Sequence, residues 1–330
     1  MKILVIRLSS IGDIVLATPI LRCLQEQLPQ VQVHVLTKPQ FTTILTANPH
    51  VEKVIPYTPD STCLSALQQE KYDYIVDLQR NHRSKQVVRR LRVKSSTYNK
   101  EDWNRILYVI TKKDFCSGRN VVQRYFEAVK PLGVKDDAEG LEYYVGDTSL
   151  SEPESLLLSG GSYAILICGA QHYTKQMPLQ QMLGLCRLIH GTVVLLGGMA
   201  ESQGWQNYLM QHPSEQWPQN ALNYCGKTTL SQSALLIQHS SVVITPDTGM
   251  MHIAAAYRKP ILAIWGNTTP QMGFFPYLSP HINFQAEGLR CRPCSRFGKQ
   301  RCPRNHFRCM MQQNWSAIAA QANRQLHAEA

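Results

Sequence analysis

The 330 residues of this chain exceed what one hydrophobic core usually organises, so a single small module is excluded and two domains are expected. Hydrophobic residues make up 44% and charged residues 17%, which excludes a disordered or a fibrous chain. The formal net charge of +11 favours anionic partners such as nucleic acid, anionic lipid or phosphorylated sugars. No apolar run approaches the about 20 residues of a bilayer-spanning helix, and Arg7 interrupts the first apolar stretch before a signal-peptide core forms, so we expect a cytoplasmic protein.

Short apolar runs alternate with segments of helical periodicity in both halves of the chain. The strand-like run 2–8 is followed by a Ser-Gly loop and a helical pattern, and the alternation continues to residue 92. It resumes at 163 and reaches residue 266. This order predicts two doubly wound, Rossmann-like α/β domains, each with a parallel sheet. Because the segment 146–161 has the Pro, Ser and Gly content of a linker, we predict domains at 1–155 and 156–330, the second ending in a helix over 312–327.

The loop after the first predicted strand carries side chains suited to chemistry. Ligands of doubly wound sheets bind at the carboxyl ends of strands. Here Ser9, Ser10, Gly12 and Asp13 supply two hydroxyls, a flexible backbone and a carboxylate. Two interpretations stay open for Asp13: a helix cap that stabilises by about 1 kcal/mol, or a general base for an incoming hydroxyl.

Three strand-following loops in the second half predict a phosphate site. A hydroxyl, a glycine amide and a helix dipole coincide at the start of the helix after residue 248, which suits a phosphate group. Individual parts of this site have competing interpretations. They are a solvated side chain for Lys175, a plain turn for the loop 197–201, and a core histidine for His252. The candidate donor-binding residues are Thr174, Lys175, Gly197, Gly198, Glu201, Asp247, Thr248, Gly249 and His252.

Three segments together resemble the family 9 glycosyltransferases, the bacterial ADP-heptose:lipopolysaccharide heptosyltransferases. They are KILVIRLSSIGDIVLATPIL at residues 2–21, Gly-Gly-x-x-Glu at 197–201, and DTGMMHIAAAYRKPILAIWGNTTP at 247–270. The resemblance implies a GT-B architecture, with two Rossmann-like domains facing a central cleft, the acceptor on the first and the nucleotide sugar on the second.

The resemblance also implies a reaction and roles for particular residues. It is an inverting, metal-independent transfer of a heptose or related sugar from an ADP-sugar to a lipopolysaccharide core or related glycan. Asp13 matches the proposed base and Lys175 the lysine at the donor diphosphate, while Asp247, Thr248, Gly249 and His252 match the donor motif. The family usually has Trp-Pro after that lysine, whereas this chain has Gln176-Met177-Pro178, which puts the register of Lys175 in question. Another nucleotide sugar and glycan on the same fold is the alternative.

Two acid-free basic clusters suggest surfaces for anionic partners. Residues 1–155 carry 21 basic and 18 acidic side chains, whereas 156–330 carry 13 and 5. Arg83 and Arg90 lie at near-helical spacing, so they form either an acceptor-binding stripe or a solvated helix face. Together with Ser9, Ser10 and Gly12 they are our candidate acceptor-binding residues. A phosphorylated, lipid-linked glycan at the inner face of the inner membrane fits this charge.

The second basic cluster is the cysteine-rich segment 290–309, which contains Cys291, Cys294, Cys302 and Cys309. A single Cys-x-x-Cys with two further cysteines predicts a structural zinc site, with disulfides or four free thiols as alternatives. Flanking Arg and Lys side chains are expected to lower the pKa values of these thiols. A nucleic-acid-binding module is the rival function for this tail. We rank it lower because aromatic residues other than Phe297 and Phe307 are missing from the cluster.

Overall fold

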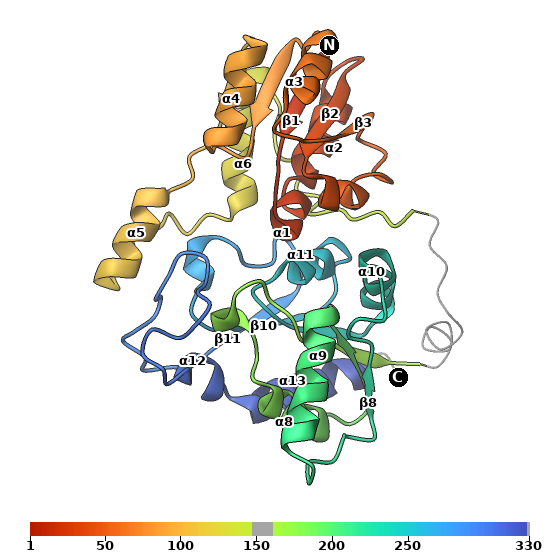
Figure 1. Cartoon of the computed structure of the whole chain (residues 1–330), viewed down its shortest axis with the longest axis vertical. Coiled ribbons are helices and arrows are strands. Elements are labelled where there is room, and N and C mark those ends of the chain that lie inside the picture. Colours follow the sequence, from red (N-terminus) through yellow and green to blue (C-terminus); the bar gives the residue numbers. More distant parts are fainter. Residues whose placement is uncertain (147–160, 329–330) are drawn as a thin grey trace. The chain divides into compact units, whose positions relative to one another are not determined.

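The structure is a computed structural model that describes residues 1–146 and 161–328. The chain forms two compact units (Figure 1). Unit 1 comprises Met1–Glu101 and Arg119–Gly146, and unit 2 comprises residues 102–118 together with the chain after the first unit. The boundary that we expected between 155 and 156 lies outside the described residues. The sequence did not indicate that residues 102–118 would pack with unit 2.

Unit 1 is built on a five-stranded parallel sheet with the order β3-β2-β1-β4-β5. The central strand β1 has apolar side chains that are buried on both faces of the sheet, as parallel sheets require. The strands are β1 (Lys2–Ile6), β2 (Gln32–Thr37), β3 (Lys53–Pro56), β4 (Tyr74–Asp77) and β5 (Ser95–Thr97).

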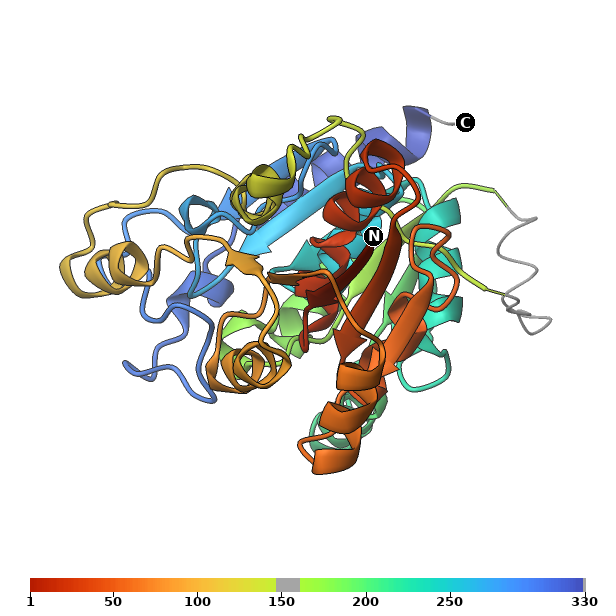
Figure 2. The same cartoon turned by 90° about the horizontal axis from the view of Figure 1, so that it is seen from above.

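Helices cover both faces of this sheet, with α3 packed against α4 and α2 against α6. Leu4 and Ile6 of β1 join one core cluster with residues of α3 and α4. Because strand side chains alternate, Ile3 and Val5 point to the opposite face. Figure 2 shows the N-terminal strands side by side, with helices on either side. The helices are α1 (Ile11–Val15), α2 (Thr18–Gln27), η1 (Pro39–Ile44), α3 (Ser61–Gln69), α4 (His82–Leu91), α6 (Val121–Val129) and η2 (Lys130–Leu132).

Unit 2 is built on a six-stranded parallel sheet with the order β11-β10-β9-β6-β7-β8. Strand order reverses between β6 and β9, so the loops after these neighbouring strands flank the switch point where such sheets bind ligands. The strands are β6 (Tyr163–Ile167), β7 (Thr192–Leu196), β8 (Ala221–Asn223), β9 (Val242–Pro246), β10 (Ile261–Trp265) and β11 (His281–Gln285).

The helices of unit 2 also form two layers. α13 packs against α8 and shares a core cluster with the strands, while α10 packs against α11. Its helices are α5 (Asp102–Thr111), η3 (Tyr173–Lys175), α8 (Leu179–Leu188), α9 (Met199–Gln211), α10 (Leu230–His239), α11 (Gly249–Ala256), η4 (Pro270–Met272), α12 (Arg308–Met311) and α13 (Trp315–Ala328). In the described residues, no helix is both long and apolar enough to cross a membrane.

The predicted fold class of two doubly wound parallel sheets is confirmed. Three local expectations differ. The helical pattern after the first strand is two helices, α1 and α2, with Pro19 in the first turn of the second. The helical periodicity near 40–47 predicts an α-helix within the first alternation, whereas the structure has the 3₁₀ helix η1, which begins at Pro39. The helix expected over 312–327 begins at Trp315, after the short α12.

Candidate functional site

In unit 1, Asp13 lies on α1 directly after β1, and it is fixed by contacts on both carboxylate oxygens. Arg7 at the end of β1 places a guanidinium nitrogen 2.5 Å from Oδ1. The backbone N–H of Ser10 donates to Oδ2 at 3.2 Å, and the hydroxyl of Ser10 donates to the same oxygen at 3.0 Å. Asp13 therefore supports the helix start, and its side chain remains 24% exposed, while its role as a base stays a prediction.

Electrostatics keep this carboxylate ionised. Burial alone raises the pKa of Asp13, but the Arg7 guanidinium and the hydrogen bonds from Ser10 outweigh it, so the pKa is lowered from its ordinary value. Arg7 is itself only 6% exposed, donates to the carbonyl of Leu78, and lies over the ring of Tyr125 at 5.6 Å. The cation beside Asp13 is thus held in place by three separate contacts.

A second loop of unit 1 holds the Ser9-Ser10 turn through Gln79, a residue that the sequence analysis did not identify. Gln79 follows β4, the strand next to β1, and its Oε1 accepts from the backbone N–H groups of Leu8 at 2.8 Å and Ser9 at 3.3 Å. Its signal was its position at the end of a predicted strand. The candidate residues Ser9, Ser10 and Gly12 are brought together with Asp13, Ser9 and Ser10 being half-buried and Gly12 buried.

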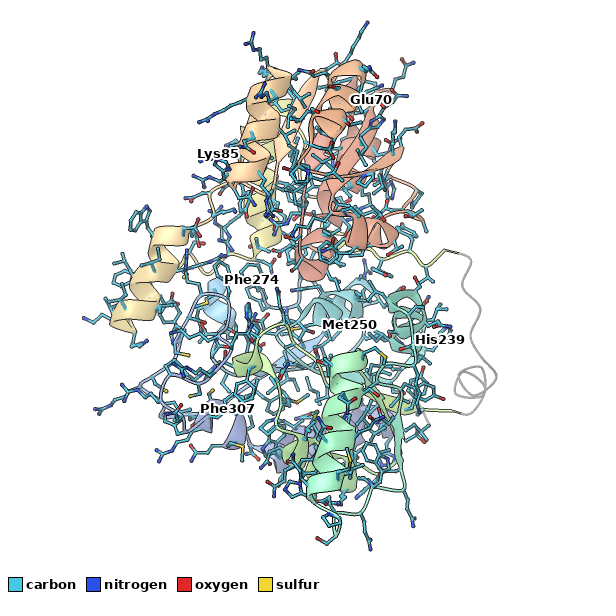
Figure 3. The ribbon with its side chains drawn as sticks, viewed as in Figure 1. Glu70, Lys85, His239, Met250, Phe274 and Phe307 are labelled. Atoms are coloured by element: carbon cyan, nitrogen blue, oxygen red, sulfur yellow. The ribbon has the colours of Figure 1, made fainter. Side chains whose placement is uncertain are left out.

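The basic stripe lies on α4 with exposed side chains. Arg83 and Arg90 are seven residues apart on this helix, and both are exposed, as is Lys85, which Figure 3 marks. Within residues 1–146 and 161–328, Arg83 and Arg90 make no ion pair with a carboxylate. These cations are available to an external anion.

In unit 2, the candidate residues gather at the carboxyl ends of three adjacent strands, β7, β6 and β9. Lys175 ends η3 in the loop after β6, and Asp247 directly follows β9. Their side chains form an ion pair with Nζ 2.7 Å from Oδ2. The hydroxyl of Thr268, in the loop after β10, donates to the same oxygen at 2.8 Å. Thr268 was not among the predicted residues, although it lies in the NTTP segment after a predicted strand.

The first turn of α11 adds hydrogen-bond donors beside this ion pair. Thr248 is the N-cap residue and Gly249 begins the helix, so free backbone N–H groups point out of the helix next to Asp247. His252 lies one turn into α11 and is buried, with an exposure of 3%. The lysine ammonium and the helix start place positive charge suited to an anion at this edge of the sheet.

Glu201 lies at the neighbouring part of this edge, after β7. Its Oε2 accepts from the backbone N–H of Gly198 at 2.8 Å, in the first turn of α9. A Cβ atom on Gly169, after β6, would lie 2.8 Å from the carboxyl carbon of Glu201. At Gly197 an added Cβ would lie 2.9 Å from the Cβ of Glu201. The glycines therefore let the carboxylate sit between the ends of β6 and β7.

Thr174, a predicted donor-binding residue, is buried and bonded to a distant segment of the chain, and its donor-binding role stays a prediction. It is 1% exposed, and its hydroxyl accepts from the backbone N–H of Lys299 at 2.8 Å and approaches the carbonyl of Lys299 at 3.2 Å. The backbone N–H of Thr174 donates to the same carbonyl at 3.1 Å. Thr174 thus ties η3, and with it Lys175, to the cysteine-rich segment.

Arg292 of the same segment organises the loop after β10. Its guanidinium donates to the carbonyls of Trp265 at 3.0 Å and of Thr268 at 2.9 Å, and also to the carbonyl of Gly266. The backbone N–H of Cys294 donates to the carbonyl of Asn267 at 3.2 Å. The cysteine-rich segment is therefore built into the same edge of the sheet, where it holds the residues around Thr268.

The four clustered cysteines carry free thiols. Burial is the largest influence on two of them, raising the pKa of Cys294 and raising that of Cys309 to about 12. The expectation that flanking cations lower these pKa values is wrong for this pair, because desolvation outweighs the nearby positive charges. In the described part of the chain, no group of three or more His, Cys, Asp or Glu side chains is arranged to hold a metal ion, and the structural zinc stays a prediction.

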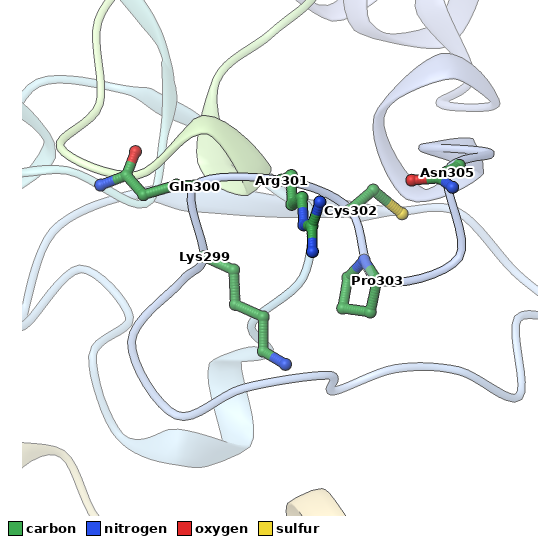
Figure 4. A pocket seen from close by; sticks show the side chains of 6 residues that line it. All are labelled: Lys299, Gln300, Arg301, Cys302, Pro303 and Asn305. Atoms are coloured by element: carbon green, nitrogen blue, oxygen red, sulfur yellow. The ribbon is translucent and has the colours of Figure 1, made fainter.

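A surface pocket of about 520 Å³ lies on this segment (Figure 4). Lys299 and Arg301 contribute cationic side chains to its lining. Cys302 is the member of the cysteine cluster that lines it. The pocket lies on the outer loop and does not include Lys175 or Asp247.

Comparison with known proteins shows the family of this chain. The model of glycosyltransferase family 9 (heptosyltransferase) matches residues 62–302. Lipopolysaccharide heptosyltransferase 2 of Escherichia coli (strain K12) is 25% identical over 301 residues, covering 84% of this chain and 86% of that protein. Lipooligosaccharide heptosyltransferase 2 of Haemophilus influenzae is 25% identical over 297 residues, covering 82% and 85%.

Solved structures share the fold over most or all of the chain. The Escherichia coli ADP-heptose lipopolysaccharide heptosyltransferase II has a TM-score of 0.72 at 20% identity and covers 100% of this chain, with 99% of its own length matched. The family 9 glycosyltransferase of Veillonella parvula has a TM-score of 0.68 at 18% identity, covering 86% of this chain and 85% of that one. This protein therefore belongs to glycosyltransferase family 9, with the GT-B fold of its structural neighbours, and it is an enzyme.

The contact between Thr174 and Lys299 predicts a stability effect. Thr174→Val leaves the backbone N–H of Lys299 without its acceptor, so the free energy of unfolding should fall by about 1–3 kcal/mol. Thr174→Ser keeps the hydroxyl and should lose less. Urea unfolding measures both, and hydrogen exchange at Lys299 should accelerate only in the valine variant.

Thr37→Val is the matched control. Thr37 is fully buried in unit 1, and its hydroxyl has no hydrogen-bond partner among residues 1–146 and 161–328. The same substitution there should leave the free energy of unfolding within about 0.5 kcal/mol. Equal losses at both positions would show that the Lys299 contact contributes nothing specific.

Proposed function

We propose that this protein is an inverting, metal-independent transferase that moves a heptose or related sugar from an ADP-sugar to a lipopolysaccharide core or related glycan. The contact of Lys175 and Thr268 with one oxygen of Asp247, beside the start of α11, carries the donor half of the proposal. The relatives that are lipopolysaccharide heptosyltransferases support the sugar and the acceptor, and a neighbour described as an ADP-heptose transferase supports the nucleotide.

The donor diphosphate would bind at the carboxyl edge of β6 and β9. The ammonium of Lys175 and the N–H groups at the start of α11 would neutralise the negative charge that grows on the leaving diphosphate. Asp247 and Thr268 hold the ammonium in position until the ligand arrives. Glu201 has one carboxylate oxygen on Gly198, and we assign its second oxygen to a ribose hydroxyl of the nucleotide.

The reaction would be a single displacement. The acceptor hydroxyl attacks the anomeric carbon, its proton passes to Asp13, and the bond between the sugar and the diphosphate breaks with its electron pair on the leaving ADP. One displacement inverts the anomeric centre. Positive charge from Lys175 and α11 supplies the stabilisation that a divalent ion gives in other transferases, and the sequence contains no Asp-x-Asp pair to bind such an ion.

The acceptor would be a phosphorylated, lipid-linked glycan, met at the inner face of the inner membrane. Arg83 and Arg90 on α4 offer exposed charge to its phosphate groups. Ser9, Ser10 and Gly12 surround Asp13 and are assigned to the acceptor hydroxyl. Because the acceptor is anchored in lipid, the enzyme would contact the membrane surface peripherally.

Two substitutions test the assigned roles. Asp13→Asn should lower kcat by at least about 100-fold with unchanged affinity for ADP, because the amide keeps the shape of the side chain but accepts no proton.

Lys175→Met should weaken ADP binding at least about tenfold, because it removes the ammonium. Isothermal titration calorimetry and initial rates measure both.

Lys135→Met is the control for net charge, because Lys135 is exposed on unit 1 and far along the chain from both assigned residues. It should leave kcat and ADP affinity unchanged. Comparable turnover in Asp13→Asn would disprove the base, and unchanged ADP affinity in Lys175→Met would disprove the diphosphate site.

The Arg7 contact predicts a pH effect. Asp13 acts as a base only when ionised, and Arg7 keeps its pKa low, so the wild-type rate should not fall between pH 8 and pH 6 through this group. In Arg7→Met, only the hydrogen bonds from Ser10 oppose the effect of burial, so the pKa of Asp13 rises and the acid limb of kcat/KM should move upward, with a rate at pH 6 several-fold below that at pH 8. Arg7→Lys retains a cation and should keep the limb closer to wild type. Coincident profiles of folded wild type and Arg7→Met would contradict the electrostatic role of Arg7.

Metal analysis tests two further expectations. The initial rate should be unchanged by EDTA, and strict dependence on magnesium or manganese would contradict the proposed mechanism. The structural zinc stays a prediction, which about one zinc per chain in protein purified without chelator would support. Four thiols that react freely in the native protein would remove that site without touching the transferase proposal.

A further inference from the structure

Helix α5 of unit 2 exposes an apolar stripe. Trp103 is 77% exposed, Leu107 42% and Ile110 71%, and their spacing of four and three residues places them on one side of the helix. Phe115, just after the helix, is 45% exposed. Large apolar side chains that gather on one exposed helix face are typical of a binding surface.

The opposite side of α5 anchors the helix through polar groups. Arg105 is 4% exposed, donates to the carbonyl of Met272 at 2.9 Å, and lies over the ring of Phe274 at 4.7 Å (Figure 3). Tyr108 is 9% exposed, and its hydroxyl accepts from Thr269 at 3.3 Å. Rotation of α5 to bury its apolar stripe would break these contacts, so the orientation of the stripe is fixed within unit 2.

The stripe adjoins the basic cysteine-rich segment. The ammonium of Lys112 donates to the carbonyl of Pro293 at 2.7 Å, and Arg296 pairs with Asp102 at 3.1 Å. Phe297 follows, 51% exposed, with the Arg296 guanidinium 5.1 Å from its ring centre. Residues 288–328 contain no acidic side chain. Between residues 290 and 309 the exposed cations are Arg290, Lys299, Arg301, Arg304 and Arg308.

We propose that this surface inserts into an anionic lipid bilayer. We define the docking face as Trp103, Leu107, Ile110, Phe115 and Phe297. Its aromatic and aliphatic side chains would enter the boundary between headgroups and acyl chains, while the flanking cations contact lipid phosphates.

Charge favours lipid over a second copy of this chain. Two copies that met through this face would bring two acid-free basic segments together, and the like charges would oppose association. An anionic membrane has complementary charge and needs no shaped groove. The docking face is the surface through which the enzyme would make the membrane contact of the proposed function. This inference rests on the proposed function in one respect, namely that the acceptor is linked to lipid.

Vesicle binding tests the docking face without donor or acceptor. Wild-type protein should cosediment with vesicles that contain phosphatidylglycerol, more weakly with phosphatidylcholine alone, and less at high salt. The double substitution Trp103→Ser with Ile110→Ser should lower partitioning into the anionic vesicles at least about tenfold, because it removes the two most exposed apolar side chains of the stripe.

The matched control lies on α9 of the same unit. Met199 is 72% exposed and Met210 70%, and changing both to serine removes similarly exposed apolar side chains elsewhere. This variant should partition within about twofold of wild type. Equal losses in the two variants would contradict a localised docking face.

Trp103 provides a direct optical readout. The chain has five tryptophans, all in the described residues, and Trp103 alone among them is exposed. Anionic vesicles should shift wild-type emission to shorter wavelength, and brominated lipids should quench it. Both signals should be lost in Trp103→Phe, which should still cosediment.

Three results would overturn the inference. They are full vesicle binding by the serine double variant, no emission change in wild type on binding, and a wild-type dimer in size-exclusion chromatography that the double variant abolishes. Transfer to a short, lipid-free acceptor should be unchanged in the double variant. Loss of vesicle binding therefore stays distinguishable from failure of the proposed reaction.

Discussion

The constraint on which the site depends is that every strand within each sheet runs in the same direction. The side chains of the central strands, such as β1 in unit 1 and β6 in unit 2, are buried on both faces and almost all apolar, so the middle of each sheet has little room for reactive groups. Reactive groups can emerge only where the chain leaves a strand, and parallel strands place all their carboxyl ends on one edge. Asp13 after β1 and Asp247 after β9 occupy that position in their respective units.

The two units use one arrangement with different cations. In each, a carboxylate is paired with a cation and accepts from a hydroxyl: Asp13 with Arg7 and Ser10, and Asp247 with Lys175 and Thr268. Arg7 is buried and held by other groups, so its effect is permanent and keeps Asp13 ionised. Lys175 has a side-chain exposure of 16% at the end of a short 3₁₀ turn, and a compact ammonium on a flexible chain can turn from the carboxylate to a phosphate. A fixed cation suits a base, and a movable one suits a ligand site.

The cysteine-rich segment stabilises the carboxyl edge of the unit 2 sheet, where the candidate donor-binding residues lie. Arg292 holds the carbonyls after β10, and Lys299 binds Thr174 through its backbone. The charge of this segment therefore has two uses. Arg292 turns inward to satisfy carbonyls at the end of a strand, whereas exposed cations such as Arg301 and Arg304 remain available to anions outside the protein.

The sequence by itself determined the fold class, the parallel sheets and most strand and helix positions, because apolar runs and helical periodicity follow directly from burial on one or two faces. It also located Asp13, Lys175 and Asp247, since each follows a strand that could be recognised. Only the tertiary structure decided which way Thr174 points, that Arg292 caps a strand, and that burial raises the pKa of Cys309 to about 12. Those features depend on contacts between residues far apart in the chain. The orientation of helix α5 also depends on such contacts. Its tryptophan is exposed and its arginine is buried, which inverts the usual amphipathic pattern. Only the residues that α5 contacts in unit 2 determine which side of the helix faces outward.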